Sequence, residues 1–568
     1  MFLKYKVTIP EAPGKLVRKN RGGQTFIEYE YERVYDPKKQ FTYPKRASIG
    51  RVDPDDPTKM TPNENFLKYF PDVNTPEEMD RSGRSPYLNI GPYVVLQKLI
   101  RESEIRELLA AYMDDNDAGF LLDLAAYSII SENNAGQYYP DYAYSHPLFT
   151  PGMRMYTDSK VSDFLQSFKP EQIVSFLNAW NKGRNKRQKI YISYDSTNKN
   201  CQAGDIELLE YGNAKVDAGQ PIYNYAVAFD TANRESLFYE QYPGSINDVS
   251  QLTCMIDKAH GFGYWNLGFI LDRGYFSRKN LAYMDQMGYG FLIMAKGMKS
   301  FIREIILENM GSFENKRSRY NDRFDVYGTT IERRLFDGEE PKRFIHIYYS
   351  DGRAYGEKQE IKQKVKRLKA YLNQCIGKEC ESFGPEIQKY FYLHYEKDGR
   401  TLKLAEENTK AIEEELSLAG YFAIVSSDRM TAKEAIERYK SRDASEKLFQ
   451  ADKSYLGNKS MRVGSDAALS IKIFIQFLAL ILRCRIYTDL KDKCEAMLKR
   501  PNYMTVPAAL KELEKIVMIR HLDGIYRLDH AITKTQKTIL DSFELTEANV
   551  RYHAQEIRKI LRETEETR

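Results

Sequence analysis

Two aspartates follow hydrophobic, strand-like runs, and their placement is the first sign of chemistry in the sequence. Asp195 follows residues 189–194, and Asp272 follows residues 268–271. Open α/β folds bind their ligands at the carboxyl ends of sheet strands, so two carboxylates at such ends indicate one shared site. A lone aspartate there is usually a turn residue or a helix cap. Two in one sheet leave the functional and the structural interpretation equally open.

A second pattern lies on a helix predicted over residues 432–454. Counted from Tyr439 at about 100° per residue, its three later members fall within about 60° on one stripe. The members are Tyr439, Arg442, Glu446 and Lys453. A charged stripe is normally a solvated helix face, but one acid, two bases and a phenol suit a metal ion together with a phosphate. Chance would produce this spacing somewhere in the chain about 1–2% of the time.

Together, Asp195, Asp272 and the Tyr-x2-Arg-x3-Glu-x6-Lys spacing resemble the bacterial DDE transposases of the YREK group, the insertion-sequence-four family. The resemblance covers roughly residues 185–490. It implies an α/β fold with a ribonuclease-H-like catalytic core, interrupted by a β-rich insertion domain and flanked by helical N-terminal and C-terminal regions. It also implies binding of double-stranded DNA at terminal inverted repeats and at the target, by a homodimer acting in trans.

The three acids define the expected catalytic chemistry. Converging carboxylates repel one another unless divalent cations neutralise them, and hard oxygen ligands suit Mg²⁺, with Mn²⁺ as a substitute. We therefore expect Asp195, Asp272 and Glu446 to be catalytic and to ligate two Mg²⁺ ions about 4 Å apart. Water would first free the 3′ hydroxyl of the transposon, and that hydroxyl would then attack target DNA. The resemblance adds a hairpin intermediate between these steps.

The resemblance also implies residues that hold DNA. The phosphate of the flipped strand end is assigned to the basic and phenolic members of the stripe, Tyr439, Arg442 and Lys453. Arg273, directly after the second aspartate, is a further DNA-binding candidate.

An aromatic side chain, commonly a tryptophan, stacks on an extruded base in this family. The chain has no tryptophan at the corresponding place, since its two are Trp180 and Trp265. Phe422 is the candidate because any aromatic face can stack a base, with Tyr421 as the other possibility. Phe422 also starts an apolar strand, so a core position is the competing interpretation.

The charge distribution fits a protein that binds DNA locally. The 568 residues carry a net charge of +5, yet residues 1–50 carry +6, residues 431–500 another +6, and the remainder −7. The first region bunches four cations that we expect to contact phosphate, although a solvated surface is an equally open interpretation: Lys15, Arg18, Lys19 and Arg21.

Other chemistries find little support. Six cysteines form neither a disulfide scaffold nor zinc-finger spacing. The seven histidines are scattered, and no phosphate-binding glycine loop occurs. Glycosidases also pair carboxylates, but they would not require Arg442 and Lys453 beside Glu446.

The elements that must position these residues change along the chain. We expect a basic DNA-binding segment that includes a two-stranded ribbon over residues 25–34, then a helical domain, a catalytic core in two parts around an insertion, and a helical tail. The boundaries are 1–85, 86–184, 185–298, 299–420, 421–490 and 491–568. The apolar run 473–482 is too short to span a membrane and indicates a buried helix. With no secretory signal at the start, we expect a cytoplasmic, nucleoid-associated protein without a membrane partner.

The sequence therefore predicts a cut-and-paste DNA transposase. The alternatives are a ribonuclease-H-like, structure-specific DNA nuclease without strand transfer, and a non-catalytic DNA-binding descendant of a transposase.

Overall fold

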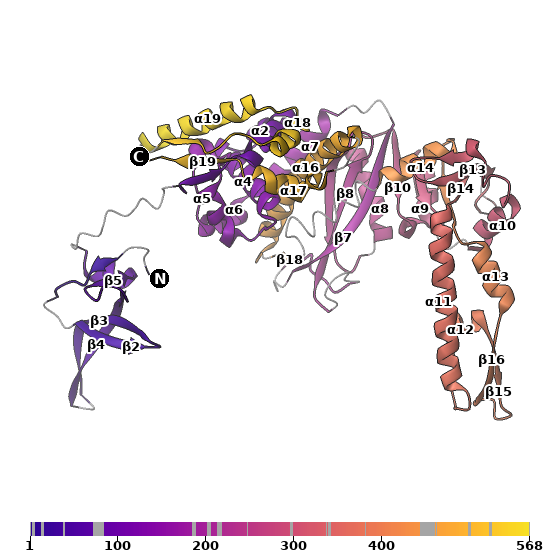
Figure 1. The fold of residues 1–568 in the computed structure, drawn as a ribbon, viewed down its shortest axis with the longest axis horizontal. Helices are drawn as coiled ribbons and strands as arrows, with labels where there is room; N and C mark the ends of the chain where they lie inside the picture. Colours follow the sequence, from indigo (N-terminus) through magenta and orange to yellow (C-terminus); the bar gives the residue numbers. More distant parts are fainter. Residues whose placement is uncertain are drawn as a thin grey trace. The chain divides into compact units, whose positions relative to one another are not determined.

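A computed structural model describes most of the chain, which divides into two compact units, Met1–Ser85 and Pro86–Arg568 (Figure 1). Outside the described residues lie 1, 3–5, 13–15, 38–39, 72–83, 185–188, 202–205, 213–218, 247, 296–298, 337, 339–341, 381, 443–459, 462, 498–500, 522–524 and 567–568.

The first unit is an antiparallel sheet in the order β1-β5-β4-β3-β2, followed by one helix. Its elements are β1 (Val7–Thr8), β2 (Leu16–Arg21), β3 (Gln24–Asp36), β4 (Phe41–Val52), β5 (Lys59–Pro62) and α1 (Glu64–Tyr69). The ribbon predicted over residues 25–34 is wrong in extent, because β3 pairs with both β2 and β4. The alternating pattern looks the same in a ribbon and in a sheet, but here it buries Ile27 against Ile49 and Phe66.

The second unit opens with helices, in the region 86–184 where a helical domain is expected. They follow strand β6 (Tyr87–Asn89) and are α2 (Gly91–Glu102), α3 (Ile105–Ala110), α4 (Asp115–Ser131), α5 (Tyr139–Ser145), α6 (Asp158–Ser167) and α7 (Pro170–Lys182).

The tail folds back onto these helices. It comprises α17 (Val506–Leu513), β19 (Val517–Arg520), β20 (Tyr526–Leu528), α18 (Lys534–Asp541) and α19 (Glu547–Glu566). Strand β19 pairs with β6 and β20 in a three-stranded sheet that the helical pattern did not indicate. The first helices and the tail share one hydrophobic core, which includes Val94 and Ile557.

The central sheet contains the two predicted aspartates. Its first part is a meander of β7 (Ile190–Cys201), β8 (Ile222–Asp230) and β9 (Glu235–Pro243), followed by α8 (Asp248–Gly261), β10 (Leu267–Leu271), α9 (Arg278–Gln286) and β11 (Gly290–Met294). The spatial order is β9-β8-β7-β10-β11. Strands β7, β8 and β9 are antiparallel, whereas β10 runs parallel to both β7 and β11.

The sheet continues beyond β11 with strands from later in the chain. Strand β17 (Tyr421–Ser426) pairs with β11, and outward from it follow β14 (Arg343–Tyr349), β13 (Val326–Arg333) and β12 (Tyr320–Asn321). Helix α10 (Lys299–Asn309) lies between β11 and β12 in the chain. The strands of residues 320–349 therefore extend the central sheet.

Between β14 and β17 the chain forms an arm with a small core of its own (Figure 1). The arm comprises α11 (Asp351–Cys375), α12 (Pro385–Tyr390), β15 (Phe391–Tyr395), β16 (Leu402–Glu407) and α13 (Thr409–Ser417). Two antiparallel hairpins, β13–β14 and β15–β16, lie within residues 299–420, where a β-rich insertion is expected.

Two helices cover the same face of the central sheet. Helix α14 (Ala432–Ser441) packs on Tyr191, Ile270 and Ile424. Helix α16 (Asp466–Ala496) packs on the neighbouring strands, where the rings of Phe477 and Tyr239 lie 5.0 Å apart. A short strand, β18 (Ser460–Met461), precedes α16 and pairs with the end of β7.

Helix α16 contains the apolar run noted in the sequence. Of the helices that the structure describes, it alone is long and apolar enough to cross a membrane. Within its apolar window 89% of the residues are buried inside the protein, so this feature is weak evidence for a span.

Two element predictions near the site need correction. Strand β7 does not end at Asp195 but continues to Cys201, because its polar second half pairs with β8 on one side and β18 on the other. The helix predicted over 432–454 ends at Ser441, whose hydroxyl donates to the Arg438 carbonyl and satisfies one terminal acceptor. The later part of the predicted helix, residues 443–454 with Glu446 and Lys453, lies outside the described residues.

Candidate active site

Two neighbouring parallel strands bring the two aspartate positions together. The last residue pair of β7 and β10 is Tyr194 with Leu271, so Asp195 and Asp272 are the next residues on each strand. Asp195 pairs with Val227, which pairs with Tyr239 on the face that α16 covers. Position 195 therefore belongs to the face that α14 and α16 share; its side chain lies outside the described part.

Asp272 is at the edge where β10 leaves the sheet. Its carboxylate accepts the Arg273 backbone N–H at 2.7 Å, which caps the short 3-10 helix Arg273–Tyr275. The side chain remains 44% exposed. The structural and the functional interpretations of this aspartate are thus compatible, because a capping carboxylate still offers oxygen to a ligand. The Arg273 side chain is exposed.

Arg442 comes to Asp272 from 170 positions further along the chain. Its Nη1 lies 3.5 Å from Asp272 Oδ1, and its side chain is only 10% exposed. The residue caps the carboxyl end of α14, where its guanidinium lies 5.5 Å from the centre of the Tyr439 ring. The structure thus brings Asp272, Arg442 and Tyr439 together. Tyr439 itself is buried among the residues between α14 and the sheet.

Glu446 and Lys453 lie outside the described residues. The chain leaves the described part just after Arg442, beside Asp272, and re-enters it at Ser460, which pairs with Asn200 of β7. Among described residues no group of three histidine, cysteine, aspartate or glutamate side chains forms a metal site. The metal assignment therefore remains a prediction.

The half-exposed Asp272 suits a divalent cation. Its oxygens are hard ligands of the kind Mg²⁺ prefers. Arg442 alongside it has the planar donor fork that suits a phosphate. The donor set at this edge therefore fits a hard cation together with a phosphodiester.

Phe422, the stacking candidate, lies on the same face of the sheet as α14. Its ring stacks on Tyr348 with centroids 5.0 Å apart, and the Arg353 guanidinium lies 4.8 Å from its centre. The neighbouring Tyr421 instead donates its hydroxyl to Glu314, and burial raises its pKa. Phe422 thus remains the better candidate, with Arg353 as a contact that the sequence did not indicate.

A polar network at the other end of these strands was also missed. Lys189 and Tyr191 both donate to Asp428 Oδ2 at 2.6 Å, and Arg438 lies 4.6 Å from the Tyr191 ring centre. Burial opposes ionisation of Asp428, yet the two donors hold its pKa below the usual value, while burial raises that of Tyr191. No sequence signal links partners 239 positions apart.

The basic residues of the first unit contact their own sheet. Lys19 and Arg21 share the carboxylate of Glu28, at 3.7 and 2.6 Å, and Arg18 donates to the Pro57 carbonyl at 3.0 Å. Lys15 lies outside the described residues. Because Lys19 and Arg21 share one acid, this surface keeps a net positive charge that could attract phosphate. DNA binding by these residues stays a prediction.

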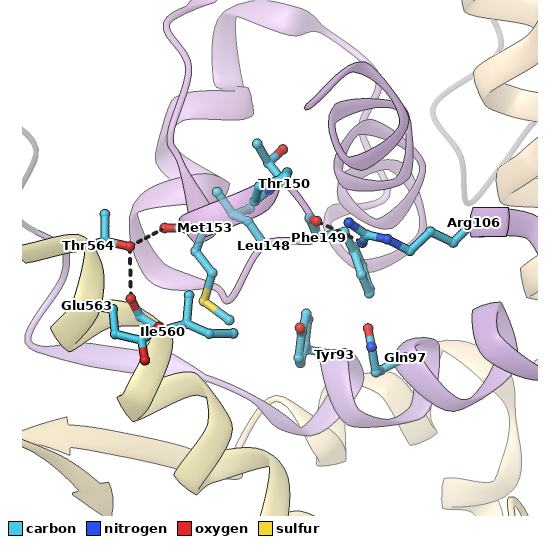
Figure 2. Close-up of a pocket in the computed structure, with 12 residues that line it drawn as sticks. Tyr93, Gln97, Arg106, Leu148, Phe149, Thr150, Met153, Ile560, Glu563 and Thr564 are labelled. Atoms are coloured by element: carbon cyan, nitrogen blue, oxygen red, sulfur yellow. Dashed lines mark hydrogen bonds between the residues drawn. The ribbon is translucent and has the colours of Figure 1, made fainter. Parts of the chain in front are cut away.

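A cavity of about 430 Å³ lies within the second unit, between its first helices and the tail (Figure 2). Arg106 donates to the Phe149 carbonyl at 3.0 Å on one side, and Thr564 donates to the Gly152 carbonyl at 3.1 Å on the other. None of the predicted site residues lines it. The candidate active site instead lies at a sheet edge, where the side chain of Asp272 is partly exposed.

Residues 189–482 match the family model described as the transposase DDE domain. No curated protein matches the chain. Among solved structures, the chain is similar to piggyBac transposase in a synaptic complex with hairpin DNA, at 9% identity and a TM-score of 0.36, over 83% of this chain and 85% of that one. That likeness is too distant to bear on function, whereas the matched segment covers just over half of the chain and both predicted aspartates. The chain therefore belongs to the transposase DDE domain family.

Proposed function

We propose that this protein is a cut-and-paste DNA transposase of the insertion-sequence-four type, with Asp195, Asp272 and Glu446 as its catalytic acids. The observation that carries the proposal is the contact between Asp272 and Arg442 at the edge where β7 and β10 lie side by side. Only the fold brings these two residues together, and both belong to the predicted set.

The strand order supports a ribonuclease-H-like core. An antiparallel meander followed by two parallel strands, in the order β9-β8-β7-β10-β11, is the arrangement that this proposal requires. Family membership supports an enzyme that cuts and joins DNA. The bacterial source and the nucleoid location belong to the same proposal.

The chain length supports a place for Glu446 at this site. Glu446 comes four positions after Arg442, so its Cα lies within about 14 Å of that of Arg442. Asp195, Asp272 and Glu446 would hold two Mg²⁺ or Mn²⁺ ions, which, when bound, supply activation of the attacking oxygen and charge neutralisation on the leaving one.

The chain's own residues position the substrate. Arg442 would donate its fork to a nonbridging phosphate oxygen, and the buried Tyr439 would hold that guanidinium in place. Lys453 would add a point charge and Phe422 a stacking surface. Water forms a new bond to phosphorus as the bond to the 3′ oxygen breaks, and the 3′ oxygen leaves as a hydroxyl. In our proposal that hydroxyl attacks phosphorus in the opposite strand, which forms a hairpin and releases the 3′ oxygen of the flanking DNA. Water then reopens the hairpin and restores the 3′ hydroxyl. Within a homodimer, this hydroxyl attacks phosphorus in the target and displaces a 3′ oxygen of the target strand.

The test uses the full chain and duplexes from the DNA that flanks its gene, labelled at the 3′ end and incubated with Mg²⁺. We expect nicks at a defined position, then hairpins, then products joined to a second duplex. Nicks without joined products would favour a structure-specific nuclease. Binding without any cleavage would contradict the catalytic proposal.

A further inference from the structure

The arm carries an unusual separation of charge. Helix α11 contains seven lysines and arginines against three acids, whereas α13 has three glutamates against one lysine. An exposed helix that only needs solubility usually alternates its signs and pairs them. The separation gives the arm one basic and one acidic side.

Several cations of α11 have no carboxylate partner in the described structure. Arg353, Lys364 and Lys369 form ion pairs with Glu357, Glu386 and Glu407. Lys358, Lys362 and Lys366 form none. At about 100° per residue, these three and Tyr355, whose side chain is 71% exposed, fall within about 80° of one another. They form a stripe of three unpaired lysines and an exposed phenol.

The stripe starts at the same edge of the sheet as the candidate active site. Strand β17 is antiparallel to β11, so its first residues lie at the carboxyl ends of β10 and β11. The last residue of β14, Tyr349, pairs with Tyr421 there, and α11 begins two residues later. From β10 to β14 are three strand spacings, about 14 Å.

The dimensions fit a DNA duplex. Twenty-five helical residues span about 37 Å, and at 3.4 Å per base pair that length covers about 11 base pairs, one turn of duplex. DNA whose scissile phosphate lies at Asp272 would therefore have room to run along α11.

We propose that the stripe formed by Tyr355, Lys358, Lys362 and Lys366 binds the phosphate backbone of the transposon-end duplex, on the side of the cleavage point that the arm covers. This inference rests on the proposed function. The lysines supply point charges and Tyr355 a hydrogen-bond donor, so the contacts add affinity and register without reading bases.

The salt dependence of binding tests the stripe. Each phosphate contact contributes about 0.9 to the slope of log affinity against log salt. The triple variant K358Q/K362Q/K366Q should therefore lower the slope by about 3, because glutamine keeps helix propensity and removes charge. Anisotropy measurements with a labelled end duplex between 50 and 200 mM salt report both slope and affinity, and we expect binding at least tenfold weaker at 100 mM.

Two further variants separate the explanations. The triple variant K378Q/K397Q/K403Q removes three unpaired lysines elsewhere in the same arm and should leave the slope unchanged. The variant K358R/K362R/K366R keeps the charge and should keep the slope. If the wild-type enzyme cuts DNA but K358Q/K362Q/K366Q binds with the wild-type salt slope, the DNA-binding role of the stripe is refuted while the proposed function stands. The same conclusion follows if K378Q/K397Q/K403Q lowers the slope equally. A wild-type chain that neither binds nor cuts DNA would overturn the proposed function as well.

Discussion

His346 makes the stability of the extended sheet depend on pH. The side chain is fully buried in β14, with Nε2 2.9 Å from the Ser426 hydroxyl and Nδ1 2.9 Å from that of Thr330. Ser426 already donates its proton to the Asp428 carbonyl at 2.8 Å, so it accepts from Nε2. The imidazole is thus neutral with its proton on Nε2, and burial, opposed only in part by Glu434, lowers its pKa from 6.5 to about 4.

The sign and size of the effect follow from that shift. Between pH 6.5 and pH 4 the unfolded chain binds a proton at this residue that the folded protein does not, so stability falls as the pH falls. With about 1.4 kcal/mol per pKa unit, the loss between pH 7.5 and pH 5 is about 2 kcal/mol. The full loss, below pH 4, is about 3 kcal/mol.

The assay is urea unfolding at pH 7.5 and pH 5, followed by tryptophan fluorescence. His346→Gln removes the titration but keeps one donor and one acceptor. Between pH 7.5 and pH 5, its free energy of unfolding should therefore fall by about 2 kcal/mol less than that of the wild type. His394→Gln removes a histidine whose side chain is 52% exposed and should behave like wild type. An equal fall in wild type and His346→Gln would refute the reasoning.

Three other substitutions test the site and its supports. Arg442→Lys keeps the charge but loses the planar fork, so cleavage should fall about 100-fold with DNA binding largely retained, and wild-type cleavage would count against the role of Arg442. Gly420→Ala should lower the unfolding free energy by roughly 1–3 kcal/mol, because φ is +91° and a Cβ would lie 2.6 Å from that of Ala354; Gly377→Ala, with φ +76° and open space, should cost less in the same thermal melts. Phe422→Ala should reduce hairpin formation while Phe422→Trp preserves it, and equal hairpin yields would exclude the stacking role.

The sequence predicted the central sheet well, because its apolar runs are long and clearly bounded. The strand-like run 268–271 lies within β10 (Leu267–Leu271), and the run 189–194 forms the first half of β7. Asp272 comes at the end of its strand as expected. The strand β7 was cut short because Ser196 to Cys201 contains asparagine and lysine, which are rare in strands; pairing on both sides and burial override that preference.

The pairing of strands that are far apart in the chain could not be predicted from the sequence. A β-rich insertion was expected over residues 299–420, but the addition of β17, β14 and β13 to the edge of β11 depends on contacts between residues 134 positions apart, such as Leu292 and Ser426. The contact of Arg442 with Asp272 was not predicted: the resemblance assigned both residues to one site, and helix α14, which was to present Arg442, ends just before it. The contact of Arg353 with Phe422 had no signal in the sequence either, because the two residues are 69 positions apart and meet only in the folded protein.

The central claim is that Glu446 completes one catalytic site with Asp195 and Asp272, and the cleavage rate of Glu446→Gln tests it most directly. The variant should bind the labelled end duplex with wild-type affinity in Mg²⁺ and show no cleavage, as should Asp272→Asn. Glutamine keeps the size of the side chain and removes only its charge, so loss of folding is not expected. Cleavage by Glu446→Gln at the wild-type rate and position would contradict the account.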